Sequence, residues 1–225
     1  MTAGGAPGDS VARIGRLHVL VDSLGVAEAA LEAGAPTLQI RLKTGTDRDH
    51  LRLATTIAER CRDAGATCLV NDRADLALAV GADGVHVGAE DLPVAVVRHL
   101  LGPTAVVGGT ARDPDTARAL VTDGATYLGV GPTFVTRSKR GLPEPIGVDG
   151  VRAVARAVDV PVIAISGITP DVVDDVLGAG AYGVAVISAV ADSPDPHIAT
   201  HDLLMAVAKA VGSGGDAGRS TGDRA

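Results

Sequence analysis

The feature of this sequence that most restricts its fold is a pattern that repeats eight times between residues 17 and 211. Each repeat begins with a short run of β-branched or other apolar residues and continues through a turn into a segment with helical periodicity. The strands predicted in this way cover residues 17–21, 37–41, 67–70, 84–87, 105–108, 126–130, 160–165 and 182–187. Because these strands are apolar along nearly their whole length, we expect a parallel sheet that is buried on both faces.

The helical segments between the predicted strands support the same interpretation. The clearest covers residues 47–63, where Leu51, Ala54, Ile57 and Cys61 lie on one face. Ala-Gly-Ala sequences at 33–35, 64–66 and 179–181 are typical of helix ends. An open, doubly wound sheet would use the same alternation, but eight units within about 195 residues fit a closed barrel better. We therefore predict a single α/β domain over residues 14–211, a (β/α)8 or TIM barrel, with flexible tails at 1–13 and 212–225.

The charge and composition of the chain argue against several classes of partner. The formal net charge is −7, and Phe, Trp and Tyr together make up 1% of the residues. We expect no binding of nucleic acid or of an anionic membrane surface, since neither a basic field nor aromatic stacking is available. The sequence shows neither a signal peptide nor an apolar run long enough for a membrane span, so we expect a cytoplasmic protein. Cys61 and Cys68 match no metal-binding or disulfide spacing, and both a monomer and a homo-oligomer stay open.

Polar residues interrupt the apolar pattern mainly at the carboxyl ends of the predicted strands. In chain order they are Gln39, Arg41, Lys43, Asn71, Asp72, Asp91, Thr110, Thr136, Ser138, Lys139, Ser166 and Ser188. In a closed parallel barrel all these ends meet at one rim, which is where such barrels carry their active sites. The sequence therefore predicts a rim site for small phosphorylated molecules, in which a local cluster of cations holds the anion.

Two groups of charged residues suggest the chemistry of this site. Gln39, Arg41 and Lys43 alternate, so they share one face if the second strand extends that far, and two cations there require an anion. The alternative is a strand that ends at residue 40, with Arg41 in a solvated loop and paired to an acid. Asp72 and Asp91 follow neighbouring strands, where two carboxylates would repel a diphosphate unless Mg²⁺ lay between them. Helix caps or ion pairs are the alternative role for these acids.

The later strands carry weaker signals. The connection over residues 131–141 is long for this fold, which suggests a mobile segment that covers a substrate. The sequences Ser166-Gly167 and Ile187-Ser188 end strands seven and eight, where such barrels often hold a phosphate on backbone N–H groups. We expect His86 and His18 to be core histidines.

Six motifs in this order resemble those of the thiamine-phosphate synthase family, and together they span nearly all of residues 17–190. They are QxRxK at 39–43, ND at 71–72, GxHxGxED at 84–91, GPTxxTxSK at 131–139, SGIT at 166–169 and VISA at 186–189. The resemblance implies a parallel barrel and a transferase that joins hydroxymethylpyrimidine diphosphate to a thiazole phosphate. The implied reaction releases diphosphate with Mg²⁺ by dissociative substitution, which needs no general base or nucleophile.

The resemblance also implies roles for individual residues. The cations Arg41, Lys43 and Lys139 would be catalytic. The pyrimidine diphosphate would be bound by these three and five further residues, and the full set is Gln39, Ile40, Arg41, Leu42, Lys43, Asn71, Thr110 and Lys139. Asp72 and Asp91 would hold Mg²⁺. The thiazole phosphate would be bound by Thr136, Arg137, Ser138, Gly167, Ile187 and Ser188.

Some positions depart from the family pattern and keep two other functions open. Leu42 replaces a usual acid, Ala89 a usual Gln and His18 a usual Tyr, while Ser166 adds a side chain where Gly usually lets the backbone approach a phosphate. A thiazole tautomerase shares this barrel and resembles the sequence SKRGLP at 138–143. Such isomerases tend to rely on a His near position 112, where this chain has Arg112, and to lose the paired acids. A non-catalytic barrel that senses thiazole phosphate is the third interpretation.

Overall fold

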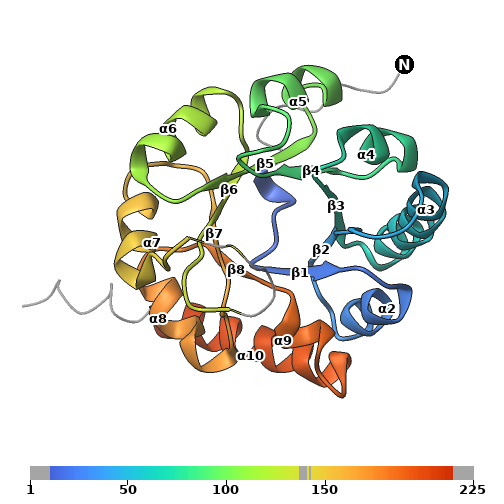
Figure 1. The fold of residues 1–225 in the computed structure, drawn as a ribbon. Coiled ribbons are helices and arrows are strands. Elements are labelled where there is room, and N and C mark those ends of the chain that lie inside the picture. The colour runs from blue at the N-terminus through green and yellow to red at the C-terminus, as the bar shows by residue number, and fades with distance from the viewer. Residues whose placement is uncertain (1–10, 137–140, 142, 215–225) are drawn as a thin grey trace, which may run out of the picture.

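The chain forms a closed barrel of eight parallel strands surrounded by helices, as the computed structural model shows for residues 11–136, 141 and 143–214 (Figure 1). Each strand pairs with the next in the sequence, and the last pairs with the first. The strands are β1 Leu17–Val21, β2 Thr37–Ile40, β3 Thr67–Asn71, β4 Gly84–Val87, β5 Val106–Ala111, β6 Tyr127–Val130, β7 Val162–Ile165 and β8 Gly183–Val186. The predicted (β/α)8 barrel is therefore confirmed.

Helices follow the strands and form the outer ring of the barrel. They are α2 Leu24–Glu32, α3 Asp47–Ala64, α4 Ala74–Val80, α5 Val94–Leu101, α6 Pro114–Thr122, α7 Gly147–Ala155, the 3₁₀ turn η1 Pro170–Val172, α8 Val173–Gly178, α9 Ser188–Ala191 and α10 Pro196–Gly214. Helix α3 starts with a capping box between Thr46 and Asp49 and ends at Gly65, whose φ of 69° lies in the left-handed region. Local sequence thus sets both ends of this helix.

The buried apolar residues lie on both sides of the barrel wall. Alternate strand residues, such as Leu38, Cys68 and Val85, face outward and pack in one large cluster with the helices. The other strand residues face the barrel interior, where a smaller cluster comprises Ile14, Leu20, Leu69, Val106, Tyr127, Ile163 and Ala185. This cluster, together with the buried polar side chains of His18 and Gln39, fills the barrel below the carboxyl ends of the strands, where such barrels carry their active sites.

The predicted end of the fifth strand is wrong. That strand was expected to stop at Gly108, whereas β5 continues to Ala111. A Cβ atom at Gly108 would lie 2.2 Å from Cζ of Tyr127 and 2.5 Å from Nδ1 of His86. The glycine therefore lies inside the strand, where it makes room for two rings that fill the barrel.

The described ends of the chain contribute to the fold. Arg13, in the predicted N-terminal tail, pairs with Asp83 at 2.8 Å and also donates to the carbonyl of Thr104. Helix α10 continues to Gly214, beyond the predicted domain end at 211. The rest of both predicted tails lies outside the described residues, so the domain limits stay a prediction. Within the described ranges, no helix combines the length and apolar character that a membrane span requires.

Candidate active site at the mouth of the barrel

The ends of β2 and β3 bring together three of the predicted site residues. The Lys43 ammonium forms an ion pair with the Asp72 carboxylate, and the Asn71 side chain donates to the other oxygen of the same carboxylate. Half of the Lys43 side chain is exposed, whereas the Asp72 side chain is 23% exposed. The cation and the acid therefore meet where solvent and a ligand can still reach them.

The backbone at Asp72 is strained. Its φ of 67° lies in the left-handed region, which few residues other than glycine adopt, although aspartate tolerates it better than most. The conformation is held by the Asp72 N–H, which donates to the carbonyl of His86 at 2.8 Å, and by a bond between Arg73 N–H and the Asn71 carbonyl. Strain of this kind collects at functional sites, where the surrounding contacts maintain it.

Asp91 lies beside Asp72. One of its oxygens accepts the backbone N–H of Gly88 at 2.7 Å. Burial, together with the neighbouring Asp72 carboxylate, raises the pKa of Asp91 above its ordinary value, although the Gly88 N–H and Lys43 act in the opposite direction. The two acids that follow β3 and β4 thus carry more negative charge than their surroundings balance.

This pair of acids fits a magnesium ion. Mg²⁺ is commonly held by one or two carboxylates, with water and substrate phosphate completing its coordination. No cluster of three or more Cys, His, Asp or Glu side chains suited to a metal occurs among residues 11–136, 141 and 143–214, so no cage built wholly from protein ligands is present there. Two acids whose charges disfavour each other are the arrangement that a bound cation stabilises.

The residues at the end of β2 divide into three kinds. Gln39 is 4% exposed and lies inside the barrel, whereas the Ile40 and Leu42 side chains pack in the outer apolar cluster, so these two offer a ligand only their backbone. The strand ends at Ile40, so the prediction that it includes Arg41 is wrong by one residue. Arg41 N–H still donates to the Val21 carbonyl, but in the described part of the chain its guanidinium makes no hydrogen bond or ion pair. The strand end and the loop position of Arg41 agree with the alternative interpretation, whereas the ion pair that it expected is absent among the described residues.

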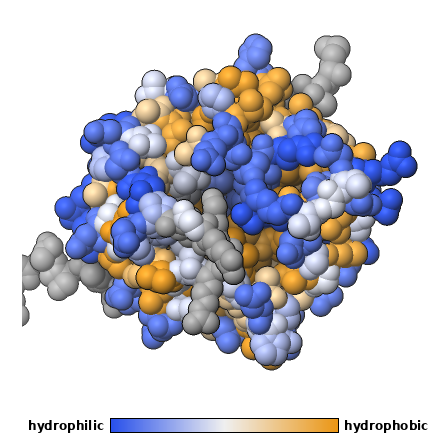
Figure 2. Space-filling view, viewed as in Figure 1, coloured by the Kyte–Doolittle hydropathy of each residue, from blue (hydrophilic) through white to orange (hydrophobic). Residues whose placement is uncertain are grey.

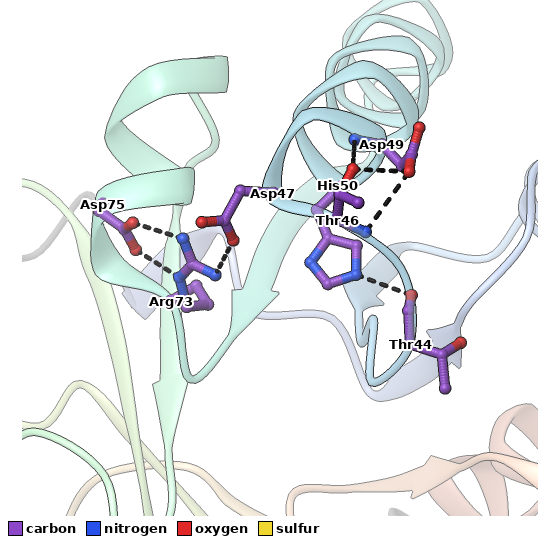
Figure 3. A network of polar contacts seen from close by, with 7 residues as sticks. All are labelled: Thr44, Thr46, Asp47, Asp49, His50, Arg73 and Asp75. Atoms are coloured by element: carbon purple, nitrogen blue, oxygen red, sulfur yellow. Dashed lines mark hydrogen bonds and ion pairs between the residues drawn. The ribbon is translucent and has the colours of Figure 1, made fainter.

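A network of surface charges supports the loops that carry these residues (Figure 3). Arg73 donates to Asp47 at the start of α3 and holds both oxygens of Asp75 at the start of α4. The Arg73 hydrogen bonds lower the pKa of Asp75 to about 2. His50 binds the Thr44 carbonyl, which fastens the chain after Lys43 to α3. Hydrophilic residues accordingly cover the region of α3 and α4 on the face shown in Figure 2.

Thr110, at the end of β5, contacts a histidine that we expected to be only a core residue. Its Oγ1 lies 2.9 Å from Nε2 of His86. Desolvation lowers the pKa of His86 to about 4, with the Asp91 charge acting in the opposite direction, so the ring is neutral near pH 7. The sequence did offer a signal that was missed: small residues, Gly108 and Gly129, occur on the next two strands and make room for the His86 ring.

The connection after β6 is bound to the end of β7. The Thr133 N–H donates to the Ile165 carbonyl at 2.8 Å, and the Phe134 N–H donates to the Ser166 carbonyl at 3.0 Å. A Cβ atom at Gly167 would lie 2.7 Å from the Cβ of Phe134, so a glycine is required there. Thr136 belongs to the described residues and has an interaction partner, whereas Arg137, Ser138 and Lys139 lie outside them.

Two departures from the family pattern have visible consequences. Ser166 adopts a φ of 82°, a left-handed conformation that suits glycine and strains a residue with a Cβ atom. Arg112 donates to the Glu144 carbonyl at 2.8 Å, which ties the end of β5 to the connection after β6. Next to Ser166 and Gly167, β8 leads through Ile187 into the short helix α9, which begins at Ser188. These four residues thus follow directly after two neighbouring strands.

Comparison with known proteins identifies the family of this chain. The family model described as thiamine monophosphate synthase matches residues 16–190. Thiamine-phosphate synthases of Salinispora arenicola and Salinispora tropica are 51% and 50% identical over 203 residues, and each match covers 86% of this chain and 98% of the relative. The solved thiamine phosphate pyrophosphorylase from Pyrococcus furiosus has a TM-score of 0.81 and 35% identity, with 87% of this chain and 96% of that chain covered. The chain therefore belongs to the thiamine monophosphate synthase family.

Proposed function

We propose that this chain acts as a thiamine-phosphate synthase, a transferase that joins a pyrimidinylmethyl group to a thiazole phosphate. The substrates are 4-amino-2-methyl-5-(diphosphooxymethyl)pyrimidine and the thiazole phosphate, and the products are thiamine phosphate and diphosphate. One observation carries the proposal beyond family membership: Asp72 and Asp91 lie side by side, and Lys43 pairs with Asp72. This arrangement suits a diphosphate that arrives with a divalent cation.

The cation-binding part of the proposal concerns the two acids. Asp72 and Asp91 would hold Mg²⁺, which when bound supplies positive charge to the departing diphosphate. The strained turn at Asp72 and the Gly88 N–H that binds Asp91 orient the two carboxylates before any ligand arrives. Asn71 holds Asp72 through a hydrogen bond in the same way. Preorganisation of this kind lowers the cost of binding, because the groups are already in place.

The remaining residues of the pyrimidine site hold and stabilise the leaving group. Arg41, Lys43 and Lys139 contact the diphosphate, while Gln39 and Thr110 bind the substrate from inside the barrel. The C–O bond to diphosphate breaks first, and its electron pair leaves on the diphosphate oxygen. The thiazole nitrogen then attacks the pyrimidine-stabilised cation and forms the new C–N bond. Positive groups fixed around the developing anion are sufficient catalysts for such a step.

The thiazole phosphate occupies the other side of the mouth. Backbone N–H groups at Gly167, Ile187 and Ser188 bind its phosphate at the ends of β7 and β8, a common phosphate site in this fold. Thr136, Arg137 and Ser138 cover the thiazole from the connection after β6. Every residue in the proposal comes from one chain, so it holds for a monomer and for a homo-oligomer, and we assign the reaction to the cytoplasm.

Two observations favour the synthase over the other candidate functions. A tautomerase requires a proton-transferring group near position 112, but the Arg112 guanidinium donates to the Glu144 carbonyl and serves as a tether. The relatives that are about half identical are named as synthases and not as isomerases. A silent sensor would have no need of paired acids whose charges disfavour each other.

An assay of diphosphate release distinguishes the three functions. The purified chain is incubated with both substrates, with each substrate alone, and with both substrates plus EDTA. We expect diphosphate and thiamine phosphate only when both substrates and Mg²⁺ are present. Conversion of the thiazole phosphate alone, without diphosphate release, would establish a tautomerase. Calorimetric binding of thiazole phosphate without turnover would establish a sensor.

A further inference from the structure

His86 is placed to control the hydrogen-bonding direction of Thr110. Its Nε2 lies 2.9 Å from the Thr110 hydroxyl oxygen. Although the residue as a whole keeps some solvent exposure, its Nδ1 is buried and has no hydrogen-bond partner among the described residues. The imidazole therefore has a single polar contact of this kind, and that contact is to a residue assigned to the substrate site.

The imidazole ring is held in place by its neighbours. A Cβ atom at Gly108 would lie 2.5 Å from Nδ1, and one at Gly129 would lie 2.8 Å from Cε1 of His86. The Tyr127 ring packs alongside, with the two ring centroids 5.5 Å apart. Because the ring fills the space above two glycines, its plane is fixed by β5, β6 and Tyr127, and the contact with Thr110 places Nε2 toward the hydroxyl.

The unpaired Nδ1 determines which nitrogen carries the proton. A buried N–H without an acceptor is rarer and costlier in proteins than a buried acceptor without a donor. The neutral ring therefore carries its proton on Nε2 and donates it to Thr110 Oγ1. With its oxygen accepting from His86, the Thr110 hydroxyl directs its own proton elsewhere. Thr110 is partly exposed at the end of β5, so that direction is the mouth.

We infer that His86 is a positioning residue that makes Thr110 a hydrogen-bond donor toward the pyrimidine diphosphate. This inference rests on the proposed function. The atom that Thr110 contacts is then an acceptor, either a diphosphate oxygen or a ring nitrogen, and never the amino group of the pyrimidine. His86 thereby selects the orientation in which the substrate binds, without touching the substrate itself.

A mutant cycle between the two residues tests the inference. His86→Phe keeps a ring above the two glycines but removes the donor, and Thr110→Val removes the hydroxyl. We expect each to raise KM for the pyrimidine diphosphate about tenfold, the usual effect of one hydrogen bond to a charged ligand, with little change in KM for the thiazole phosphate. The double variant should be no worse than either single variant, because both remove the same interaction.

A conservative variant separates positioning from packing. In His86→Gln the side-chain amide can donate from nearly the position of Nε2, so KM should return to within about threefold of the original value. Additive effects in the double variant, failure of His86→Gln to restore KM while His86→Phe folds normally in urea titrations, or an equal rise in KM for the thiazole phosphate would each overturn the inference.

The same proteins keep the two proposals apart. If the unaltered chain releases no diphosphate, the proposed function fails. Calorimetric titration of the four proteins with the pyrimidine diphosphate then gives the same cycle in Kd, and additive changes there overturn the role of His86 separately. Coupled changes in Kd without turnover would support the role of His86 in binding alone.

Discussion

The two ends of the barrel are both polar, but they differ in how far the protein itself pairs their charges. At the amino ends of the strands there is a hollow of about 540 Å³, lined in part by Arg13, Arg62, Thr67 and Asp83. Arg13 pairs with Asp83, which also accepts the Cys68 N–H at 2.9 Å, and Thr67 donates to the Arg13 carbonyl. Several of the polar groups around this hollow are therefore already satisfied within the protein.

At the carboxyl ends of the strands, by contrast, several charges are not balanced within the protein in this way. Asp91 lies against another acid, the Arg41 guanidinium has no hydrogen bond or ion pair in the described part of the chain, and Asp72 and Ser166 have left-handed backbones. A hollow alone therefore does not mark a site in this protein. The difference lies in the unbalanced charges and the strained backbone at the carboxyl ends. Neither feature stabilises the fold until a ligand supplies the missing partner.

The largest contrast is expected between the acids Asp91 and Asp83, one from each end. Asp91→Asn should lower the Mg²⁺-dependent kcat/KM by about a hundredfold or more, because it removes one of the two carboxylates that would hold the Mg²⁺ beside the leaving group. Its free energy of unfolding should not fall, since burial and Asp72 disfavour the charged form of Asp91. Diphosphate release and urea unfolding measure the two effects.

The matched variant Asp83→Asn should lower stability and leave turnover unchanged. It weakens the ion pair with Arg13, which is partly exposed, and should cost about 1 kcal/mol of unfolding free energy while diphosphate release is unchanged. If both variants lost turnover equally, or if Asp91→Asn kept turnover and lost stability, the distinction between the two ends would be wrong.

A second effect, intermediate in size, is a pH dependence of the unfolding free energy that comes from the histidines inside the barrel. Burial, aided by the nearby His86, lowers the pKa of His18 to about 3 despite its bond to Gly15, and desolvation lowers that of His86 to about 4. Both lie below the unfolded value of about 6.5, so the unfolded chain binds more protons in this interval. Stability is therefore full above about pH 6.5 and falls as pH falls toward about 4, by about 2.5 kcal/mol per pH unit near pH 5.

Urea titrations from about pH 7.5 to about pH 4.5 measure this dependence of the unfolding free energy on pH, because the interval begins above the unfolded histidine pKa of about 6.5 and extends below it. His86→Phe should reduce it by about half, because one of the two protons is no longer taken up on unfolding. His50, which is partly exposed and bonds the Thr44 carbonyl, offers a control in His50→Gln, where the slope should persist. A slope that does not change in His86→Phe would show that the acid sensitivity comes from elsewhere.

The smallest effect concerns Arg73, whose side chain is 42% exposed. Arg73→Ala should cost at most about 1 kcal/mol of unfolding free energy, as surface ion pairs usually do. Because Arg73 ties α3 to α4 beside the mouth, KM for the pyrimidine diphosphate should also rise, by about twofold to threefold.

The matched control for Arg73 is Arg118→Ala, which removes a surface pair with Asp115 on α6. It should change stability by a similar small amount and leave KM unaltered. If both variants left KM unaltered, support of the loops after β2 and β3 would not depend on this network, and the ordering of the mouth would come from Asp72 and its backbone bonds alone.

Much of this protein was predictable from local sequence. Interruptions of the apolar pattern placed Lys43, Asp72 and Asp91 at strand ends, and closure of the barrel brought them together. The errors concern residues whose environment is set by a partner that is distant in the sequence. The fifth strand was predicted to end at Gly108, because the two rings that occupy the space beside this glycine come from β4 and β6. Arg41 was assigned to a strand because alternation alone cannot show where pairing with a neighbour stops.

The sequence by itself determined the barrel, its order of strands and the rim on which its chemistry lies, because periodicity and turn residues act over short stretches of chain. Only the tertiary structure decided that Asp72 and Asp91 disfavour each other's charge, that the Arg41 guanidinium has no partner among the described residues, and that His86 contacts Thr110. Those facts depend on distances between side chains on different strands, and such distances exist only after eight strands have closed on one another.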